Sequence, residues 1–561
     1  MKVIIVGGVA GGASCAARLR RLDEQAEIVM LERGPYVSFA NCGLPYHVGG
    51  VIAKESDLLV ANERVFREMF NVDCRTRTEV ISISASEKTV QIKDLESGTV
   101  ATEAYDKLVL APGAETFRPP LPGLDLPGIF ELRTVPDARA IREWIERGTS
   151  FLAGMEKYSG FQTIRPKTRA VVVGGGFIGL ETAENLTDRG FEVTLIQRGP
   201  QPLKPLDPEF GHLIVEHLER HGIRMVTGDG AAGFERTDDA QHLVVRTASG
   251  AEHLAELVVV ALGVRPNTKL ATDAGLTIGE RRGIVTDDHM RTSDPDIYAV
   301  GDAVEVKDFN TGEQTLVALA GPANRQARIA ADNITGRDST YRGTQGTSIL
   351  KLFEATVAWT GVNEKTLKRL GDEDYEKVYL YPNSHAGYYP GAEPIALKVL
   401  FRKSDGRVLG AQAVGDDGVD KRISELALAI QLGATVYDLE EAELAYAPPY
   451  GSAKDPVNFA GFVAADVLRG DMPIAHWESL DGRLVLDVRH EPELAVEQAP
   501  DAIHIPLEQL RSRLDELPRD REILVVCRSG QRAYSATRCL VQNGFDARVL
   551  SGGMLSHAMR A

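Results

Sequence analysis

Lys2-Val-Ile-Ile-Val6, followed by Gly7-Gly-Val-Ala-Gly-Gly12, decides the fold of this chain. A helix-forming stretch continues through Leu22, and a second apolar run, Glu27 to Leu31, ends at the acidic Glu32. Strand, glycine turn, helix, strand and acid in this order indicate a dinucleotide-binding unit. The glycines permit a tight turn and a close approach of a pyrophosphate, and the helix N-terminus supplies amide N–H groups.

The same plan recurs later in the chain. A predicted strand, Ala170 to Val173, precedes Gly174-Gly-Gly-Phe-Ile-Gly179, a helix through Leu186 and the strand Glu192 to Ile196. This copy fits the GxGxxG pattern fully, whereas Val9 occupies the middle glycine position of the first copy. Two such units imply two nucleotide cofactors.

Two further segments complete this pattern. Tyr105 to Gly113 is predicted to be a strand that runs into a glycine turn, and Thr292 to Asp302 a strand that ends in a carboxylate. With these motifs the chain resembles the flavoprotein disulfide reductases that have two dinucleotide domains. The resemblance implies that the first unit holds FAD, that Asp302 contacts the ribityl chain, and that the second unit holds NAD(P)H. The FAD residues so implied are Gly7, Gly8, Ala10, Gly11, Gly12, Glu32, Arg33, Pro112, Gly113, Gly301 and Asp302, and those for NAD(P)H are Gly174, Gly176, Gly179, Gln197 and Arg198.

The preference for one nicotinamide nucleotide depends on the end of the second strand of the second unit. An NAD-preferring unit usually has an acidic residue there, which accepts hydrogen bonds from the ribose hydroxyls. Here the strand ends in Gln197 and Arg198. Since no carboxylate repels a 2′-phosphate and an arginine is adjacent, we expect NADPH or both nucleotides to be used.

Cys42 is the candidate redox residue, in Ser38-Phe-Ala-Asn-Cys-Gly-Leu-Pro-Tyr46. Many flavoprotein disulfide reductases have a second cysteine five residues later, but His47 occupies that position here. A single thiol cannot complete an internal dithiol cycle. Its redox partner must therefore be a cofactor thiol, a substrate sulfur, or oxygen in a sulfenic acid.

The segment around Cys42 and the first glycine turn resemble the coenzyme A disulfide reductase branch of this superfamily, over roughly residues 1 to 465. The resemblance implies that Cys42 forms a mixed disulfide with coenzyme A. Arg18 and Arg21, three residues apart on a predicted helix, share a face that provides a basic patch. Phe70 departs from the pattern, because some relatives have a lysine there that contacts coenzyme A. The implied coenzyme A contacts are Ser14, Arg18, Arg21, Ser38, Asn41 and Lys454.

Tyr388 and Tyr446 match tyrosines that, in this branch, approach the active cysteine from the partner subunit. A phenol group at that position is able to protonate a leaving thiolate. Ordinary packing of an amphipathic ring is the alternative for both residues. The resemblance therefore implies a homodimer.

The C-terminal region contains a second candidate thiol, in Ile523-Leu-Val-Val-Cys-Arg-Ser-Gly-Gln-Arg532. A strand, a six-residue loop from Cys527 to Arg532 and a helix are predicted here. Such a loop directs backbone N–H groups and a helix N-terminus at the sulfur, which favours an anionic persulfide. This region resembles rhodanese sulfurtransferases, including Asp487-Val-Arg489 and Ser551-Gly-Gly553. The resemblance implies that Cys527 and Arg532 are catalytic.

The composition excludes several other classes of protein. The 561 residues carry a formal net charge of −17, which argues against simple electrostatic binding of nucleic acid. Five cysteines are too few for a disulfide framework, and they indicate a reducing cytoplasm. No apolar run reaches the roughly 18 residues of a membrane span. We expect neither a metal site nor a membrane or nucleic-acid partner.

We expect an α/β protein of four domains. They are two Rossmann-like domains for FAD and NAD(P), an α+β dimerisation domain and a C-terminal α/β rhodanese domain. Residues 149–168 are predicted to be an insertion of unexplained role. The predicted boundaries are 1–140 with 265–330 for FAD, 141–264 for NAD(P), 331–465 for dimerisation and 470–561 for the rhodanese domain.

The predicted activity is NAD(P)H-dependent reduction of coenzyme A persulfide or polysulfide by a homodimeric FAD enzyme, with release of sulfide. Cys527 delivers sulfane sulfur, because a second thiol domain has little purpose in a simple disulfide reductase. Three alternatives stay open: a coenzyme A disulfide reductase, an NAD(P)H oxidase or peroxidase that cycles Cys42 through a sulfenic acid, and a sulfur-carrier domain regulated by the flavoprotein.

Overall fold

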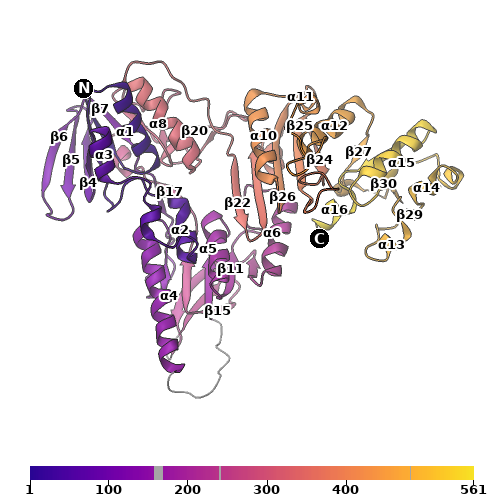
Figure 1. The fold of residues 1–561 in the computed structure, drawn as a ribbon, viewed down its shortest axis with the longest axis horizontal. Coiled ribbons are helices and arrows are strands. Elements are labelled where there is room, and N and C mark those ends of the chain that lie inside the picture. Colours follow the sequence, from indigo (N-terminus) through magenta and orange to yellow (C-terminus); the bar gives the residue numbers. More distant parts are fainter. Residues whose placement is uncertain (157–167, 239–241, 481, 561) are drawn as a thin grey trace. The chain divides into compact units, whose positions relative to one another are not determined.

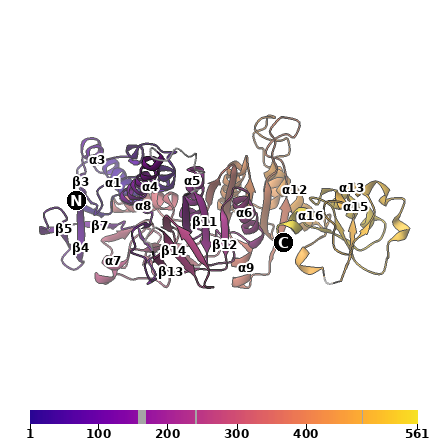
Figure 2. The ribbon, with the colours of Figure 1, turned by 90° about the horizontal axis from the view of Figure 1, so that it is seen from below.

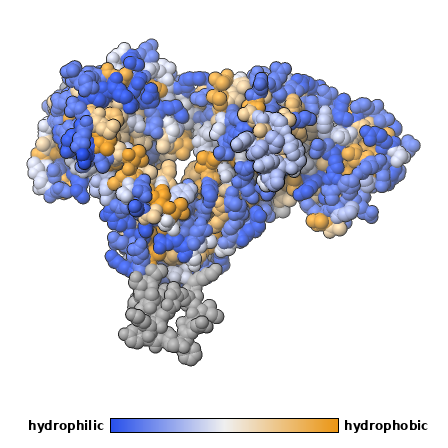
Figure 3. Space-filling view, in the orientation of Figure 1, coloured by the Kyte–Doolittle hydropathy of each residue, from blue (hydrophilic) through white to orange (hydrophobic). Residues whose placement is uncertain are grey.

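A computed structural model describes residues 1–156, 168–238, 242–480 and 482–560 (Figure 1). The chain forms two compact units, Met1–Pro202 with Glu219–Thr344, and Leu203–Leu218 with Gln345–Ala561. Among the described helices, none combines the length and the apolar character needed to cross a membrane. The drawn surface is mostly hydrophilic (Figure 3).

The first unit contains a parallel five-stranded sheet in the order β19-β7-β1-β2-β3. Its strands β1 and β2 are the two predicted ones, and they are buried along almost their whole length, as is usual for parallel sheets covered on both faces. Helix α1 follows β1 and packs against α8. The bounds are β1 Lys2–Val6, α1 Ala10–Leu22, β2 Glu27–Leu31, β3 Asp73–Arg75, β7 Lys107–Leu110, β19 Ile297–Ala299 and α8 Ala320–Ile334.

Shorter elements surround this sheet. Helix α3 begins at an asparagine cap, because the Asn62 side chain accepts a hydrogen bond from the backbone N–H of Val65. The antiparallel sheet β4-β5-β6 comprises Thr78–Ser84, Thr89–Asp94 and Val100–Ala104. The other elements are α2 Leu44–Gly49, α3 Glu63–Phe70, β8 Ala114–Thr116, β17 Val264–Pro266, α7 Lys269–Asp273, β18 Ile284–Val285, β20 Val304–Lys307 and β21 Gln314–Thr315.

The second dinucleotide unit is a parallel sheet in the order β12-β11-β10-β16-β9, with β11 and β12 side by side in Figure 2. A small antiparallel sheet, β13-β14-β15, accompanies it. Of the 149–168 segment, 149–156 form the end of α4 and 157–167 lie outside the described residues. The bounds are β9 Ile129–Phe130, α4 Val135–Glu156, β10 Arg169–Val173, α5 Phe177–Asp188, β11 Glu192–Gln197, β12 Arg224–Thr227, β13 Ala231–Arg236, β14 Leu243–Thr247, β15 Glu252–Ala255 and β16 Leu257–Val260.

The second unit begins with an antiparallel sheet in the order β22-β23-β26-β25-β24. Helices α10 and α12 share its apolar core. Asp455 caps α12 through the Val457 N–H and also binds the buried Arg422 at 2.8 Å. The bounds are α6 Pro208–Arg220, β22 Ser348–Leu352, β23 Ala355–Gly361, α9 Glu364–Leu370, β24 Tyr375–Leu380, β25 Ala396–Arg402, β26 Val408–Gly415, α10 Val419–Leu432, α11 Val436–Glu441 and α12 Pro456–Arg469.

The C-terminal part of this unit is a parallel sheet in the order β27-β31-β30-β28-β29. One local prediction is wrong in detail: Arg532, predicted to end the loop, is already in α15. The bounds are β27 Ile474–Ala475, β28 Leu484–Asp487, α13 Glu491–Leu494, β29 Ile503–His504, α14 Leu507–Leu510, β30 Ile523–Val526, α15 Gln531–Gln542, β31 Ala547–Leu550 and α16 Gly553–Ala558.

A buried ionic cluster joins separate segments of the second unit. The Lys398 ammonium lies 2.9 Å from Asp207, 2.6 Å from Glu209 and 2.8 Å from Glu364. Lys377 continues the network from Glu364 to Glu478 at the start of the C-terminal part. Burial opposes ionisation of Glu364, yet the lysines hold its pKa well below the ordinary value. A buried charge is tolerated only when it is paired, so these segments must assemble together.

Candidate active sites

A cavity of about 570 Å³ in the first unit is lined by the predicted FAD residues. It lies at the N-terminus of α1, where the helix dipole and free amides favour a pyrophosphate. Gly8 and Gly12 do not line it, but Gly12 packs beneath the turn. The lining includes Gly7, Ala10, Gly11, Glu32, Arg33, Pro112, Gly113, Gly301 and Asp302.

Glu32 closes the turn at the end of β2. Its two carboxylate oxygens accept the backbone N–H groups of Gly8 at 2.8 Å and Gly34 at 2.7 Å. These bonds fix the carboxylate at the cavity wall, where it would accept hydrogen bonds from ribose hydroxyl groups of FAD. The donor set and the cavity therefore fit the FAD expected from the sequence.

Arg133 is a cavity residue that sequence reasoning missed. Its guanidinium lies 2.9 Å from Asp302 and donates to the carbonyl of Ala114 at 3.2 Å. The Asn41 amide donates weakly, at 3.5 Å, to the Arg133 carbonyl. No motif marks Arg133, because it acts through a contact with a carboxylate 169 residues away.

Cys42 opens into the same cavity, next to Asn41. Its side chain is exposed, but the surrounding protein still desolvates the sulfur. This burial raises the pKa of the Cys42 thiol, the negative charge of Glu181 raises it further, and Arg133 opposes the rise. The thiolate therefore forms less readily here than in water unless further positive charge approaches it.

Glu181, on α5, is the second residue that sequence reasoning missed. Burial raises the pKa of its carboxyl group to about 7. The Tyr46 hydroxyl donates to it at 3.4 Å. Because this pKa lies near neutrality, Glu181 is able to hold or release a proton in the vicinity of Cys42.

His47 occupies the place of a second redox cysteine and is buried. Its Nδ1 lies 2.7 Å from the Ile52 carbonyl, and Arg142 approaches the ring at 3.1 Å. Since a carbonyl oxygen only accepts, Nδ1 carries the hydrogen. These two contacts hold the His47 side chain in place within α2.

A second cavity, of about 340 Å³, brings together three of the predicted coenzyme A contacts: Ser14, Arg21 and Ser38. Arg328 and Asn324, from α8, also line it. Sequence reasoning missed both, although they are four residues apart and so share a helix face. Phe66 and Phe70 form part of the wall, with ring centroids 5.9 Å apart. Aromatic rings beside two arginines suit a nucleotide with phosphate groups.

Arg18 does not line this second cavity. It binds Asp332 of α8 at 2.8 Å, and both side chains are mostly buried. Arg18 therefore fastens α1 to α8, and the cationic wall consists of Arg21 and Arg328. Asn41 lines the first cavity, and the exposed Lys454 belongs to the second unit.

The second dinucleotide turn repeats the geometry of the first. Gly176 caps α5, and the backbone N–H of Gly175 donates to Gln197 Oε1 at 2.9 Å, as Gly8 donates to Glu32. Because Oε1 accepts this bond, the NH2 group of Gln197 remains available as a donor. A carboxylate at this position would offer only acceptors. Arg198 is exposed and lies along Gly230.

Tyr388 and Tyr446 lie together in the second unit. Their hydroxyl groups are 2.7 Å apart, although the residues are 58 positions apart in the chain. They are 76% and 48% exposed. Large rings held together in solvent indicate a surface that another molecule covers.

Cys527 lies at the end of β30 and is only 1% exposed. Its sulfur accepts the backbone N–H groups of Gly530 at 3.2 Å and Ala533 at 3.3 Å. The Cys527 carbonyl accepts from Met554 at 2.9 Å, which fixes the loop to the 551–553 turn. The loop thus directs donors at the sulfur, as its sequence predicts.

Arg532, in the first turn of α15, binds Glu493 of α13 through two hydrogen bonds, of 2.6 and 2.7 Å. Glu493 was not singled out in the sequence. The Asp487-Val-Arg489 motif forms a similar but buried pair, with 2.7 Å between Arg489 and Asp487. Both pairs are bidentate, the strongest form of this contact.

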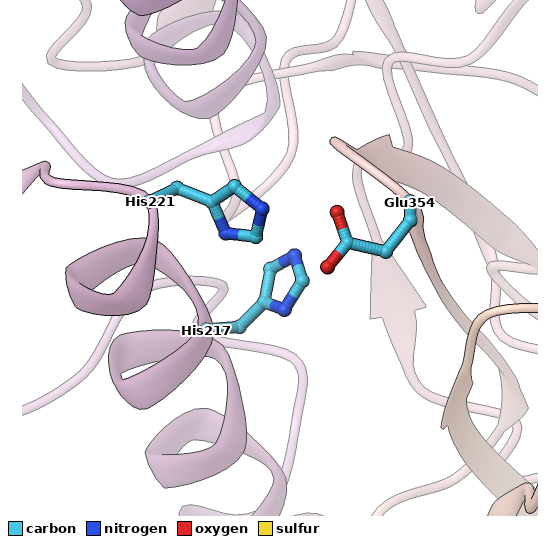
Figure 4. A group of neighbouring side chains, drawn as sticks. All are labelled: His217, His221 and Glu354. Carbon is cyan, nitrogen blue, oxygen red and sulfur yellow. The ribbon is translucent and has the colours of Figure 1, made fainter.

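Two groups of side chains among the described residues lie close enough to share a cation. Asp207, Glu209 and Glu364 lie close enough to share a cation, but Lys398 occupies that place. Figure 4 shows His217 and Glu354 pointing toward one another. His217 Nε2 lies 3.0 Å from the Leu352 carbonyl, so this nitrogen carries a hydrogen and is not a ligand.

The Glu181 charge generates a prediction for the reactivity of Cys42. Glu181 is ionised above about pH 7, and so it is charged when the thiol titrates. Glu181→Gln should therefore lower the pKa of Cys42. The pH dependence of Cys42 alkylation by iodoacetamide in the purified holoenzyme measures this shift.

The matched control is Glu192→Gln, which removes the same charge from the exposed start of β11. It should leave the alkylation midpoint unchanged. An unchanged midpoint in Glu181→Gln would contradict the electrostatic assignment.

Family models match three parts of the chain. Residues 1–327 match the pyridine nucleotide-disulphide oxidoreductases, residues 347–455 match their dimerisation domain, and residues 475–558 match the rhodanese-like domain. The α/β architecture and its two extra domains are thereby confirmed.

Individual relatives agree with this assignment. A coenzyme A disulfide reductase of Staphylococcus haemolyticus is 34% identical and aligns with 83% of this chain and 100% of its own length. The structure of reduced CoADR-RHD from Bacillus anthracis is 44% identical, with a TM-score of 0.94 and coverage of 100% and 98%. An NAD-dependent persulfide reductase from A. fulgidus is 39% identical, with a TM-score of 0.89 and coverage of 99% and 100%. The chain belongs to the FAD-dependent pyridine nucleotide-disulphide oxidoreductases, which use FAD and NAD(P)H, and carries a dimerisation domain and a rhodanese-like domain.

Proposed function

We propose that the enzyme is a homodimer that reduces coenzyme A persulfide or polysulfide and releases sulfide. The observation that carries this proposal is the presence of two single-thiol sites in one chain. Cys42 opens into the FAD cavity with a buried His47 in place of a partner thiol, and Cys527 is cradled by backbone N–H groups. A simple disulfide reductase needs only the first site.

Cys42 carries the reductive step. Its thiolate attacks the inner sulfur of coenzyme A persulfide, so that a mixed disulfide forms and hydrosulfide leaves. When bound, FAD supplies the two electrons that return this disulfide to two thiols, and NAD(P)H is their source. Glu181, with a pKa near neutrality, is placed to take up or release the accompanying proton.

The cavity beside α1 and α8 is our candidate for the nucleotide end of coenzyme A. Arg21 and Arg328 meet the phosphate groups, and Phe66 and Phe70 pack against the base. Ser38 and Ser14 contact the intervening chain. The similarity to a coenzyme A disulfide reductase supports this assignment.

Cys527 supplies the substrate. Its thiolate takes the outer sulfur from a donor and becomes a persulfide, and the donor leaves as the thiolate or sulfite. Coenzyme A thiol then attacks the outer sulfur, so that coenzyme A persulfide forms and the Cys527 thiolate is regenerated. Gly530 and Ala533 stabilise the anionic sulfur throughout.

The exposed Tyr388 and Tyr446 serve the active site of the partner subunit in this proposal. Their hydroxyl groups donate a hydrogen bond to the leaving thiolate at the partner's cysteine. Their mutual hydrogen bond and exposure support this role. The exposed Lys454 is our further candidate for a contact with coenzyme A phosphates.

The substrate assignment is tested in an anaerobic assay of NAD(P)H oxidation and sulfide release. We expect kcat/KM for coenzyme A persulfide to exceed that for coenzyme A disulfide by about tenfold or more. This ratio corresponds to a difference in activation free energy of about 1.4 kcal/mol or more. Cys42→Ser should abolish both reactions. Absence of sulfide above background contradicts the proposal, and rapid NAD(P)H consumption with oxygen alone favours the oxidase alternative.

The rhodanese site is tested with Cys527→Ser. This variant should reduce preformed coenzyme A persulfide at the wild-type rate but lose most of its sulfide release from a donor plus coenzyme A, since only the loading step is removed. Cys539→Ser, on the neighbouring helix α15, is the matched control. Unchanged sulfide release from the donor in Cys527→Ser would support the carrier alternative, if the wild-type protein also delivers persulfide to a separate acceptor.

The nicotinamide preference is tested at Gln197 and Arg198. We propose NADPH, or both nucleotides, because Gln197 offers an amide donor and Arg198 an adjacent charge. Arg198→Ala should lower kcat/KM for NADPH by about tenfold, with little effect on NADH, since only the 2′-phosphate loses a partner. Arg220→Ala, at the exposed end of α6, is the control. A strong preference for NADH in the wild type contradicts the proposal.

A further inference from the structure

The positive charge of Arg532, near Cys527, is already neutralised within the protein. Arg532 has a raised pKa, chiefly because Glu493 hydrogen-bonds to it, and the Cys527 sulfur contributes a smaller part. Arg532 therefore lies near the thiol. Both of its terminal nitrogens are engaged by Glu493, at 2.6 and 2.7 Å. The cation and its carboxylate together add no net charge to the loop.

Glu493 is held in this place by its own backbone. The N–H of His490 donates to Glu493 Oε2 at 3.0 Å, within a capping box at the start of α13. Hydrogen bonding to Arg532 lowers the pKa of Glu493 to about 2, so the carboxylate is ionised at every working pH. Both side chains of the pair are 27% exposed, which distinguishes this pair from a mobile surface pair.

The effect of the Arg532–Glu493 pair on sulfur loading of Cys527 depends on the charge of the sulfur donor. Thiosulfate carries two negative charges, shared between its outer sulfur and the sulfite group that leaves, whereas a thiol persulfide carries at most one at its reacting sulfurs. Backbone N–H groups stabilise the sulfur of either donor. A dianion interacts more strongly with nearby charges than a monoanion does, so the Glu493 carboxylate, which is paired with Arg532, repels it more.

We propose that Glu493 determines donor specificity: it closes Cys527 to doubly charged inorganic donors and reserves it for persulfides of thiols. This inference rests on the proposed role of Cys527 as the sulfur-loading residue. In the favoured step the Cys527 thiolate attacks the outer sulfur of the donor, the new S–S bond forms, and the old S–S bond breaks. The donor leaves as a thiolate that retains the electron pair of the broken bond.

The test compares two donors in single-turnover loading of the full-length holoenzyme. Thiosulfate loading is followed by the sulfite released, and loading by glutathione persulfide by the gain of one sulfur atom at Cys527 in the mass spectrum. Cys527→Ser gives the background for both. We expect Glu493→Gln to accelerate thiosulfate loading by about tenfold or more, and persulfide loading by less than about threefold.

Glu491→Gln is the matched control, because it removes the same charge from the exposed face of the same helix α13. It should change neither rate. Unchanged thiosulfate loading in Glu493→Gln, or equal acceleration with both donors, would overturn the inference. Reduction of preformed coenzyme A persulfide at Cys42 reports that each variant is folded. If that reaction is absent in the wild type, the proposed function fails, and the loading rates still decide the role of Glu493.

Discussion

In each of the two dinucleotide turns the main chain passes so close to itself that only glycine is tolerated. A Cβ on Gly12 would lie 1.8 Å from the Gly7 carbonyl oxygen, and a Cβ on Gly179 would lie 1.8 Å from that of Gly174. This approach lets a helix begin directly after the strand, so that its amide groups face the cofactor. Both cofactor sites, and the position of Cys42 beside the first, depend on it.

Several arginines of this acidic protein are paired with carboxylates within the chain. Arg133 binds Asp302, Arg18 binds Asp332, and Arg532 binds Glu493. Within the described residues no ion pair of Arg21 or Arg328 occurs, and these two line the cavity that suits a phosphorylated ligand. We therefore infer that the sites bind anions mainly through backbone amides and a few uncommitted arginines, and that the carboxylates determine which anions are admitted.

The local sequence was sufficient for much of the architecture. The strands β1, β2 and β30 agree with their predicted bounds, because short apolar runs next to turns leave few alternatives. Arg18 shows the limit of such reasoning. Its helical spacing from Arg21 is real, but Asp332, more than 300 residues later, engages its side chain. Arg133, Glu181 and Glu493 were missed for the same reason, since each acts through a distant partner.

The sequence by itself determined the family, the two dinucleotide units and the identity of both candidate thiols, because these depend on glycine spacing and on residues adjacent in the chain. Only the tertiary structure decided the electrostatic setting of each thiol. Glu181 raises the pKa of Cys42, and Glu493 neutralises the arginine beside Cys527. The physical reason is that charge interactions depend on distance in space and on burial, and neither can be read from position along the chain.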